Sequence, residues 1–381
     1  MTKAEQRPYI GGQAVIEGVM MRSPLSFAIV VRRASGELLV RERPVHRVVE
    51  KAPSPVRKWP FVRGVATLIE AIGLGSEALR FSSEIYERDH LDDAPPGSGS
   101  SRSLGGRGLQ SLAFWMAALA THEPDPGSPP PASGAEPDAG RRLLSGVTLL
   151  FGIGLFVVLP QAAAALVNRS AGLSLDLRSP YFQALTGMFK LAIVVGYLLL
   201  IRRIPEIRRV FQYHGAEHKT ISTYEAQEPL LVANARAKTT LHPRCGTTFI
   251  VMVALVSIFA FTAIAPLLPR LPVSGFVENV MLILLKLPFL LPIAAVTFEI
   301  QRVFARYCAR GPLRALLWPG FLVQKITTIE PDDSQLEVAL SALRTTLWRE
   351  QASVAAPVAS TDRTFLDFDA LSADPGYGRA A

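Results

Sequence analysis

Cysteine is scarce in this sequence, and apolar residues are scarce near its start. Of 381 residues only two are cysteines, Cys245 and Cys308, which are too few for a disulfide framework. The opening stretch, "MTKAEQRPYIGGQAV", is polar and lacks the apolar core of a cleavable signal peptide. We therefore expect no network of disulfides, and we expect the N-terminus to lie in the cytosol.

Apolar residues are abundant further along the chain. Hydrophobic residues make up 49% of the sequence, and the mean hydropathy of +0.27 is well above that of an average soluble protein. Each of four apolar runs meets the requirement of about 20 residues for a helix that crosses the hydrocarbon of a bilayer. The runs cover residues 143–167, 181–201, 248–268 and 276–300. The sequence therefore predicts a mainly α, polytopic membrane protein with about four transmembrane helices.

The distribution of charge predicts how these helices are oriented. The formal net charge is +8, and the arginines cluster at the ends of the apolar runs rather than along one stripe, so we expect no nucleic-acid partner. The loops at 168–180 and 269–275 are short and hold few arginines. The positive-inside rule then places the 202–247 loop and both termini in the cytosol. We expect a multi-pass protein of the cell (inner) membrane.

The remaining segments are predicted to be cytosolic or disordered. Alternation around a Ser-Gly turn predicts a β-hairpin over residues 26–44. Residues 61–86 have helical spacing and predict one helix, or a helical hairpin broken near Gly73 and Gly75, that lies on the membrane or dips into it. The expected regions are 1–90 (cytosolic, with the hairpin and the amphipathic or re-entrant helix), 91–140 (disordered linker), 141–202 (transmembrane helices 1 and 2), 203–247 (cytosolic His/Cys loop), 248–301 (transmembrane helices 3 and 4), 302–352 (cytosolic helices) and 353–381 (disordered tail).

The stretch "QYHGAEHKT" between the second and third apolar runs has the pattern of a metal-binding helix. His214 and His218 are four residues apart, so on a helix both imidazoles lie on one face and can reach one ion. Glu217 completes a His-x-x-Glu-His order, in which the glutamate acts as general base in metalloproteases of this type. The pattern is short and also occurs by chance.

A second stretch, "LHPRCGTTF", offers two further ligands. His242 and Cys245 are separated by two residues, a spacing that suits a tight turn presenting both side chains to zinc. Histidine and cysteine ligands favour Zn²⁺, or Fe²⁺, over Mg²⁺. The alternative is that the histidines are polar residues at the membrane surface and that "HPRCG" is a capped turn.

The number of ligands separates two kinds of metal site. Four protein ligands would make a closed, structural site, whereas three would leave a position for water or substrate. In the second case Glu217 is the expected base. Glu225 and Glu299 are alternative ligands or partners of the ligands.

Two lysines lie within the predicted transmembrane helices. Lys190 is in the second run and Lys286 is in the fourth, at similar depth under this topology. A charge at that depth is costly and indicates function. The runs contain no carboxylate at that depth as a partner, which leaves Glu70 or Glu77 of the 61–86 segment, or an anionic lipid or phosphate group. The alternative is a lysine whose amine reaches the membrane surface or water.

Four motifs together resemble the YqhQ-like family of bacterial membrane proteins. They are "GGQAVIEGVMMRSP" (11–24), "YHGAEHKTISTYE" (213–225), "HPRCGTTF" (242–249) and "TTIEPDDSQLEVA" (327–339). The family has no established reaction, and its members are described only as predicted metal-dependent enzymes. The resemblance therefore implies a metal site but no substrate.

The resemblance also draws attention to Glu17 and Arg22 in the first motif. Glu17 is expected near the metal and Arg22 on an anionic substrate. The alternative is a glycine-rich turn with a surface ion pair.

The sequence supports three hypotheses about function. The first is a metal-dependent membrane enzyme, a hydrolase at the cytosolic face, acting on a lipid-linked or membrane-protein substrate. The second is a membrane scaffold or assembly factor with a structural zinc. The third is a small transporter that uses Lys190 and Lys286. The sequence carries no signal for the oligomeric state.

Overall fold

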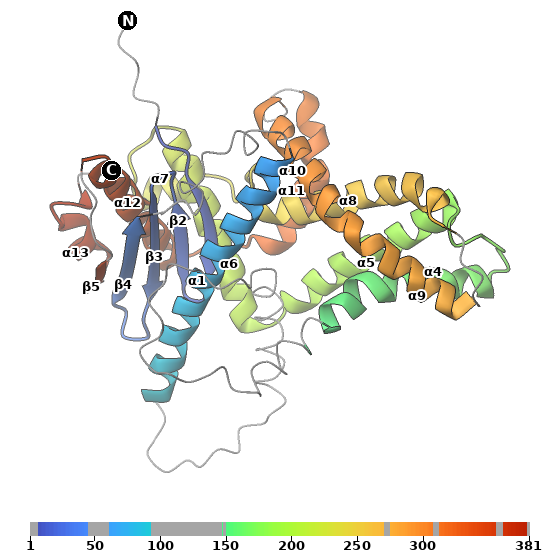
Figure 1. Cartoon of the computed structure of the whole chain (residues 1–381). Helices are drawn as coiled ribbons and strands as arrows, with labels where there is room; N and C mark the ends of the chain where they lie inside the picture. Colours follow the sequence, from blue (N-terminus) through green and yellow to red (C-terminus); the bar gives the residue numbers. More distant parts are fainter. Residues whose placement is uncertain are drawn as a thin grey trace, which may run out of the picture.

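The computed structural model describes residues 7–44, 61–92, 147, 150–269, 275–307, 312–355 and 361–378. The described chain is mostly helical and has two parts that lie side by side (Figure 1). One part is a β-sheet with helices on its faces, and the other is a set of long apolar helices. The linker predicted at 91–140, apart from the end of one helix at Asp92, lies outside the described residues.

The sheet has five antiparallel strands in the order β1-β2-β3-β4-β5. The hairpin predicted over 26–44 is confirmed as β3 and β4, which turn near Gly36 at a φ of +91°. The strands are β1 Gly11–Val15, β2 Gly18–Arg22, β3 Ser26–Arg32, β4 Leu38–Pro44 and β5 Thr361–Phe365.

The prediction of a disordered tail beyond residue 353 is wrong for the described residues there. Strand β5 pairs with β4, Val40 opposite Arg363, and the short helix α13 (Phe368–Ala373) follows it. A polar strand at the end of a chain gives little local signal, because its hydrogen-bonding partner lies more than 300 residues away in sequence.

The sheet is covered on both faces because its strands alternate apolar side chains between them. One face packs against α6 (Pro205–Glu225) and α12 (Asp333–Ala355), in a core that includes Val19, Val30 and Leu340. The other face packs against α1 (Val62–Asp92), in a core that includes Phe27 and Leu79. These layers hold α6 firmly against the sheet.

Helix α1 agrees with the first alternative predicted for residues 61–86, a single helix rather than a helical hairpin. It is one continuous helix of 31 residues with no break at Gly73 or Gly75. Its second half packs on the sheet, and Glu77 pairs with Arg43 of β4. Glu77 is therefore not the partner of the lysines in the apolar helices, and of the two alternatives the helical hairpin is wrong.

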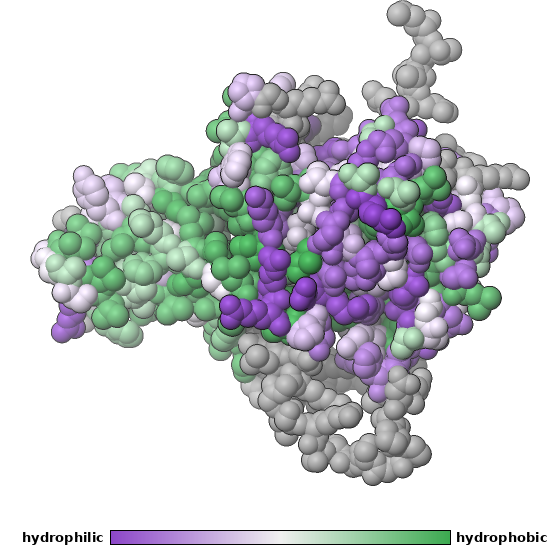
Figure 2. Space-filling view, turned by 180° about the vertical axis from the view of Figure 1, so that it is seen from behind, coloured by the Kyte–Doolittle hydropathy of each residue, from purple (hydrophilic) through white to green (hydrophobic). Residues whose placement is uncertain are grey.

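Among the described residues, four helical segments are long and apolar enough to cross a membrane, as predicted: Leu150–Ser170, Pro180–Ile201, Gly246–Leu267 and Gly275–Phe304. Figure 2 shows them as a hydrophobic surface beside the hydrophilic sheet part. Phe259 and Phe276 are 75% and 81% exposed on this surface. An apolar surface of this size needs a partner such as lipid. The elements here are η3 (Gly154–Val158), α4 (Leu159–Ser170), α5 (Pro180–Ile201), α8 (Gly246–Ile264), η4 (Ala265–Leu267), α9 (Gly275–Lys286), η5 (Leu287–Phe289) and α10 (Leu290–Tyr307).

Short helices connect the two parts. The predicted His/Cys loop at 203–247 is mainly the helix α6, followed by α7 (Val232–Arg236). Elements η6 (Pro312–Leu317) and α11 (Trp318–Thr327) follow α10, and α11 packs against α8. The chain then enters α12 and returns to the sheet.

A buried ion pair joins the sheet to α12 and gives a test of this packing. Arg349 and Glu42 have side chains that are 0% and 2% exposed, with the nearest atoms 3.6 Å apart. We expect Glu42→Ala to lower the free energy of unfolding by about 3–5 kcal/mol, because it leaves the guanidinium without its charge partner. Equilibrium unfolding in detergent measures this. Glu37→Ala, which removes a surface pair with Arg33, is the control and should cost less than about 1 kcal/mol. Equal losses would contradict the prediction.

Candidate metal centre

Helix α6 presents His214 and His218 on one face, as their spacing predicts. Pro205 occupies the first turn of the helix, where its missing N–H costs nothing. The two imidazole rings lie one turn apart, with centroids separated by 4.5 Å. His218 is buried and His214 is partly buried.

Cys245 comes to the same place from the start of α8. It is the N-cap residue of that helix, and its Sγ accepts a hydrogen bond from the Thr247 N–H at 3.4 Å. Sγ lies 3.2 Å from Nε2 of His214. One donor atom from each of His214, His218 and Cys245 lies within 4.8 Å of the other two. The structure therefore brings three of the predicted ligands together.

The outer nitrogens of both histidines are held by backbone carbonyls. Nδ1 of His214 lies 2.9 Å from the carbonyl oxygen of Thr327, and Nδ1 of His218 lies 2.5 Å from that of Thr240. Because a carbonyl only accepts, each Nδ1 carries a proton, and in the neutral ring Nε2 presents a lone pair. Histidines that bind metals in proteins are commonly oriented in this way.

Nε2 of His218 is buried and makes no hydrogen bond of standard geometry to the described residues, although His218 lies close enough to the Cys245 sulfur to help lower the pKa of the thiol. A buried nitrogen without a partner is costly. A cation shared with His214 and Cys245 would satisfy it. Zinc bonds of about 2.0–2.1 Å to nitrogen and about 2.3 Å to sulfur place tetrahedral ligand atoms roughly 3.3–3.6 Å apart. The cluster needs only small movements to reach that geometry, so its residues fit zinc.

The charges in the cluster are coupled. Burial opposes ionisation of Cys245, but the neighbouring His214 and His218 outweigh it and hold the pKa of the thiol well below its usual value. Burial also opposes a charge on His214, yet the Cys245 sulfur raises the pKa of that imidazole to about 9. The N-terminus of α8 further favours a thiolate. The sulfur is therefore ready to act as a ligand.

Glu217 lies beside the cluster and touches strand β1. It is 5% exposed, and burial raises the pKa of its carboxyl, against the attraction of His214 and His218. A Cβ placed on Gly12 would lie 2.7 Å from Glu217 Oε1. Gly12 therefore makes the room that the Glu217 carboxylate occupies. This contact explains the second glycine of the first motif.

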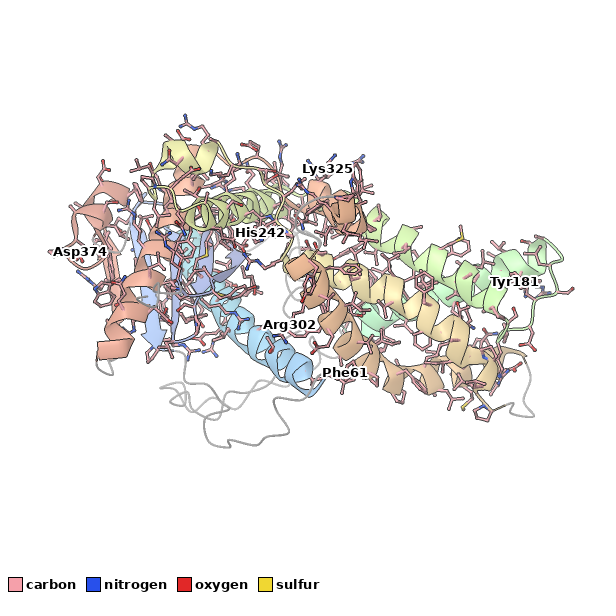
Figure 3. All side chains as sticks on the ribbon, turned by 90° about the horizontal axis from the view of Figure 1, so that it is seen from above. Phe61, Tyr181, His242, Arg302, Lys325 and Asp374 are labelled. Carbon is pink, nitrogen blue, oxygen red and sulfur yellow. The ribbon has the colours of Figure 1, made fainter. Side chains whose placement is uncertain are left out.

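His242 is close to the cluster but faces a different partner. Its ring centroid lies 5.7 Å from that of His218, and its Nε2 lies 3.4 Å from an oxygen of Glu225, which also pairs with Arg244. Burial lowers the pKa of His242, although Glu217 acts against this. In Figure 3 His242 lies between the sheet part and the apolar helices. The assignment of His242 as a ligand stays a prediction.

The remaining predicted residues are spread more widely. Glu17 accepts two hydrogen bonds from Arg209, both of 2.5 Å, at the start of α6 rather than in the cluster. The Arg22 side chain lies next to Gly11. Glu299 accepts from the Phe61 N–H at 3.3 Å. Lys190 and Lys286 lie among the apolar helices, on α5 and α9.

Sequence reasoning missed the residues that hold the second stretch in place. The Gln324 side chain on α11 accepts from the His242 N–H and donates to the His242 carbonyl, each at 2.8 Å, and donates to Thr248 at 2.7 Å. Gly215 packs directly against the backbone of Ile329. A Cβ on residue 215 would lie 2.1 Å from the Ile329 carbonyl oxygen. Thr327 and Ile329 belong to the fourth of the motifs that carry the family resemblance. That motif was the available signal that this segment lies at the site.

The fold and the cluster define a helical protein with four helices of membrane-spanning length and a His/His/Cys group beside a small antiparallel sheet. Comparison with known proteins places it in a family. Residues 59–349 match the family described as "Protein of unknown function (DUF1385)", and the chain belongs to that family. It is 31% identical over 360 residues to an uncharacterized protein, YqhQ, of Bacillus subtilis (strain 168), covering 93% of this chain and 96% of that protein. The match supports the predicted YqhQ-like resemblance. No solved structure matches the chain.

Proposed function

We propose that the chain is a metal-dependent membrane enzyme, a hydrolase whose site lies at the cytosolic face of the cell membrane. His214, His218 and Cys245 would hold the metal, most simply Zn²⁺, with Fe²⁺ as the alternative. The observation that carries the proposal is the buried Nε2 of His218, which makes no hydrogen bond of standard geometry to the described residues and lies with two other ligand atoms.

Three protein ligands leave one position open, which is the arrangement of catalytic zinc sites. When bound, the cation would supply a positive charge that polarises a substrate carbonyl or phosphoryl group and makes water more acidic. Glu217 lies next to the ligands on α6, where its carboxylate can take the proton of an attacking water and pass it to the leaving group. Burial of Glu217 keeps bulk water from competing at this carboxylate.

The location supports the proposed substrate class. Cys245 begins α8, one of the four long apolar helices, so the cluster lies where the sheet part meets those helices. Arg202, Arg203 and Arg208 follow α5 at the same junction, which supports a cytosolic position by the positive-inside rule. A substrate attached to the membrane, a lipid-linked molecule or a membrane protein, would reach a site at this level.

A structural role for the same cation is the second candidate. The cluster joins α6, which packs on the sheet, to the start of α8 among the apolar helices. A metal there would fix the two parts to one another, as expected of a scaffold or assembly factor. A catalytic metal site requires Glu217 as the base, whereas a structural metal site does not.

Metal analysis of the full-length protein, purified in detergent without chelator, tests the proposal directly. We expect about one zinc or iron per chain, because the three ligand atoms converge on a single point. Removal of the metal by a chelator should lower the unfolding midpoint, since the metal binds the folded chain only. A protein that contains no stoichiometric metal and gains no stability from added Zn²⁺ would contradict both the catalytic and the structural candidate.

A further inference from the structure

Two lysines from different helices line one cavity among the apolar helices. Lys190 lies ten residues after the start of α5, roughly 15 Å along that helix, and Lys286 ends α9. The start of α5 is at the end of the apolar helices far from the sheet, where Tyr181 is labelled in Figure 3. The cavity measures about 40 Å³ and is also lined by Gln161, Gln183, Ser257 and Phe261.

No carboxylate neutralises these ammonium groups from the helices around them. The described parts of α4, α5, α8, α9 and α10 contain two acidic residues, Glu278 and Glu299. Glu278 pairs with Arg178 at the far end of the helices, and Glu299 accepts from the Phe61 N–H near the sheet part. Two lysine amines therefore line one cavity without a matching carboxylate on these helices.

Lys286 donates its hydrogen bonds to neutral side chains. Its Nζ donates to Oε1 of Gln161 at 3.0 Å and to Oε1 of Gln183 at 2.9 Å. Each amide is oriented from its other end, because Nε2 of Gln161 donates to the Asn279 carbonyl and Nε2 of Gln183 donates to the Leu177 carbonyl. Amide oxygens replace water around an ammonium group but add no negative charge to balance it.

Lys190 has a weaker set of partners. Among the described residues its one hydrogen-bond acceptor is Oγ of Ser257, at 3.4 Å. Ser257 donates its own proton to the Ala254 carbonyl at 2.7 Å, which leaves its oxygen to accept. An ammonium group has three N–H donors, so Lys190 can donate to a further acceptor in the cavity that it lines. The Phe261 ring lies near both amines, with its centroid 5.8 Å from Nζ of Lys190 and 5.5 Å from Nζ of Lys286.

We propose that this cavity is a binding site for a compact inorganic anion, held by Lys190 and Lys286. A charge buried at membrane depth requires a compensating partner, and an anion supplies one to both lysines at once. Because a cavity needs at least about 10–15 Å³ of such space to hold one water, and a water takes up about 30 Å³ in the liquid, this cavity has room for about one water or one small ion. That space suits one compact inorganic ion, whereas a lipid headgroup with its glycerol does not fit.

The anion site is independent of the metal centre but rests on the placement of the four helices in a bilayer. It requires no cation at His214, and its ligand need not be a substrate. The metal content of each preparation is therefore measured alongside the anion experiments. A loss of anion binding with unchanged metal content bears on this site alone.

The test compares anions at constant ionic strength with the full-length protein in detergent. We expect the unfolding midpoint to be several degrees higher in sodium bromide or sodium phosphate than in sodium gluconate, whose anion is too large for the cavity. Lys190→Met should remove this difference. Lys325→Met, which removes an exposed lysine outside the four long helices, is the matched control and should retain it.

Crystals of the unmutated protein grown with bromide give a second measurement that does not depend on a variant folding. We expect an anomalous scattering peak between the two amines. Equal midpoints in all three salts together with no bromide peak at the lysines would overturn the proposal. Stabilisation by phosphatidylglycerol but by neither inorganic anion would also overturn it, because the ligand would then be a lipid.

Discussion

The variant His218→Ala is expected to lower zinc affinity by at least about 100-fold. Losing an outer partner of a ligand typically costs 10–100-fold in affinity, and losing the ligand itself should cost more. The remaining Cys245–His214 contact of 3.2 Å would stay in place, but two ligands do not hold zinc tightly. Metal content after dialysis against a zinc buffer measures the change.

Alkylation of Cys245 reports the same change independently. A metal-bound sulfur is protected from iodoacetamide, whereas a free thiolate beside an imidazole reacts. In a Cys308→Ala background the label reports only Cys245, because the chain has two cysteines. Because Cys245 is only 5% exposed, labelling will be slow in both proteins, but we expect it to require chelation in the unmutated protein and not in His218→Ala.

His90→Ala is the matched control for this substitution. His90 is an exposed histidine on α1 whose Nδ1 also lies near a backbone carbonyl, that of Tyr86 at 2.8 Å. Its loss should change neither zinc affinity nor labelling. If His218→Ala behaved like the control in both measurements, the cluster would be a hydrogen-bonded thiol and imidazole pair, and the metal proposal would fail.

The convergence of His214, His218 and Cys245 could be predicted from the sequence because its information is local. Residues four apart on a helix share a face, so the spacing of His214 and His218 needed only that the stretch be helical. Cys245 followed from a short turn motif before a long apolar run. The four long helices followed from length and hydropathy alone.

The packing around the site could not be predicted, since it depends on contacts between distant segments. Nothing near Gly12 in sequence shows that Glu217 fills the space beside it, more than 200 residues away. No sequence feature distinguishes Gln324 from other glutamines. Its role follows from the packing of α11 against α8, which brings it to His242. Strand β5 was missed for the same reason, because β4 supplies its hydrogen bonds. The structure shows that the four motifs are one assembly around α6.

Within that assembly, substitution of Glu217 distinguishes a catalytic metal site from a structural one. Glu217→Gln keeps the size of the side chain but removes its ability to take a proton. We expect hydrolysis to fall by about 10²–10⁴-fold, the usual contribution of a general base, while the metal content stays the same. The assay uses the purified, zinc-loaded protein in lipid nanodiscs against chromogenic esters, phosphoesters and peptide amides.

A steric variant tests the same carboxylate without changing it. Gly12→Ala places a methyl group 2.7 Å from Oε1 of Glu217, so the carboxylate must move, and we expect hydrolysis to fall with the metal retained. Gly73→Ala on α1, where a Cβ meets open space, is the control and should leave the rate unchanged. If Glu217→Gln and Gly12→Ala both retained the full rate, Glu217 would not be the base. If only the zinc-free protein lost stability and no variant affected a reaction, the cation would serve to join α6 to α8.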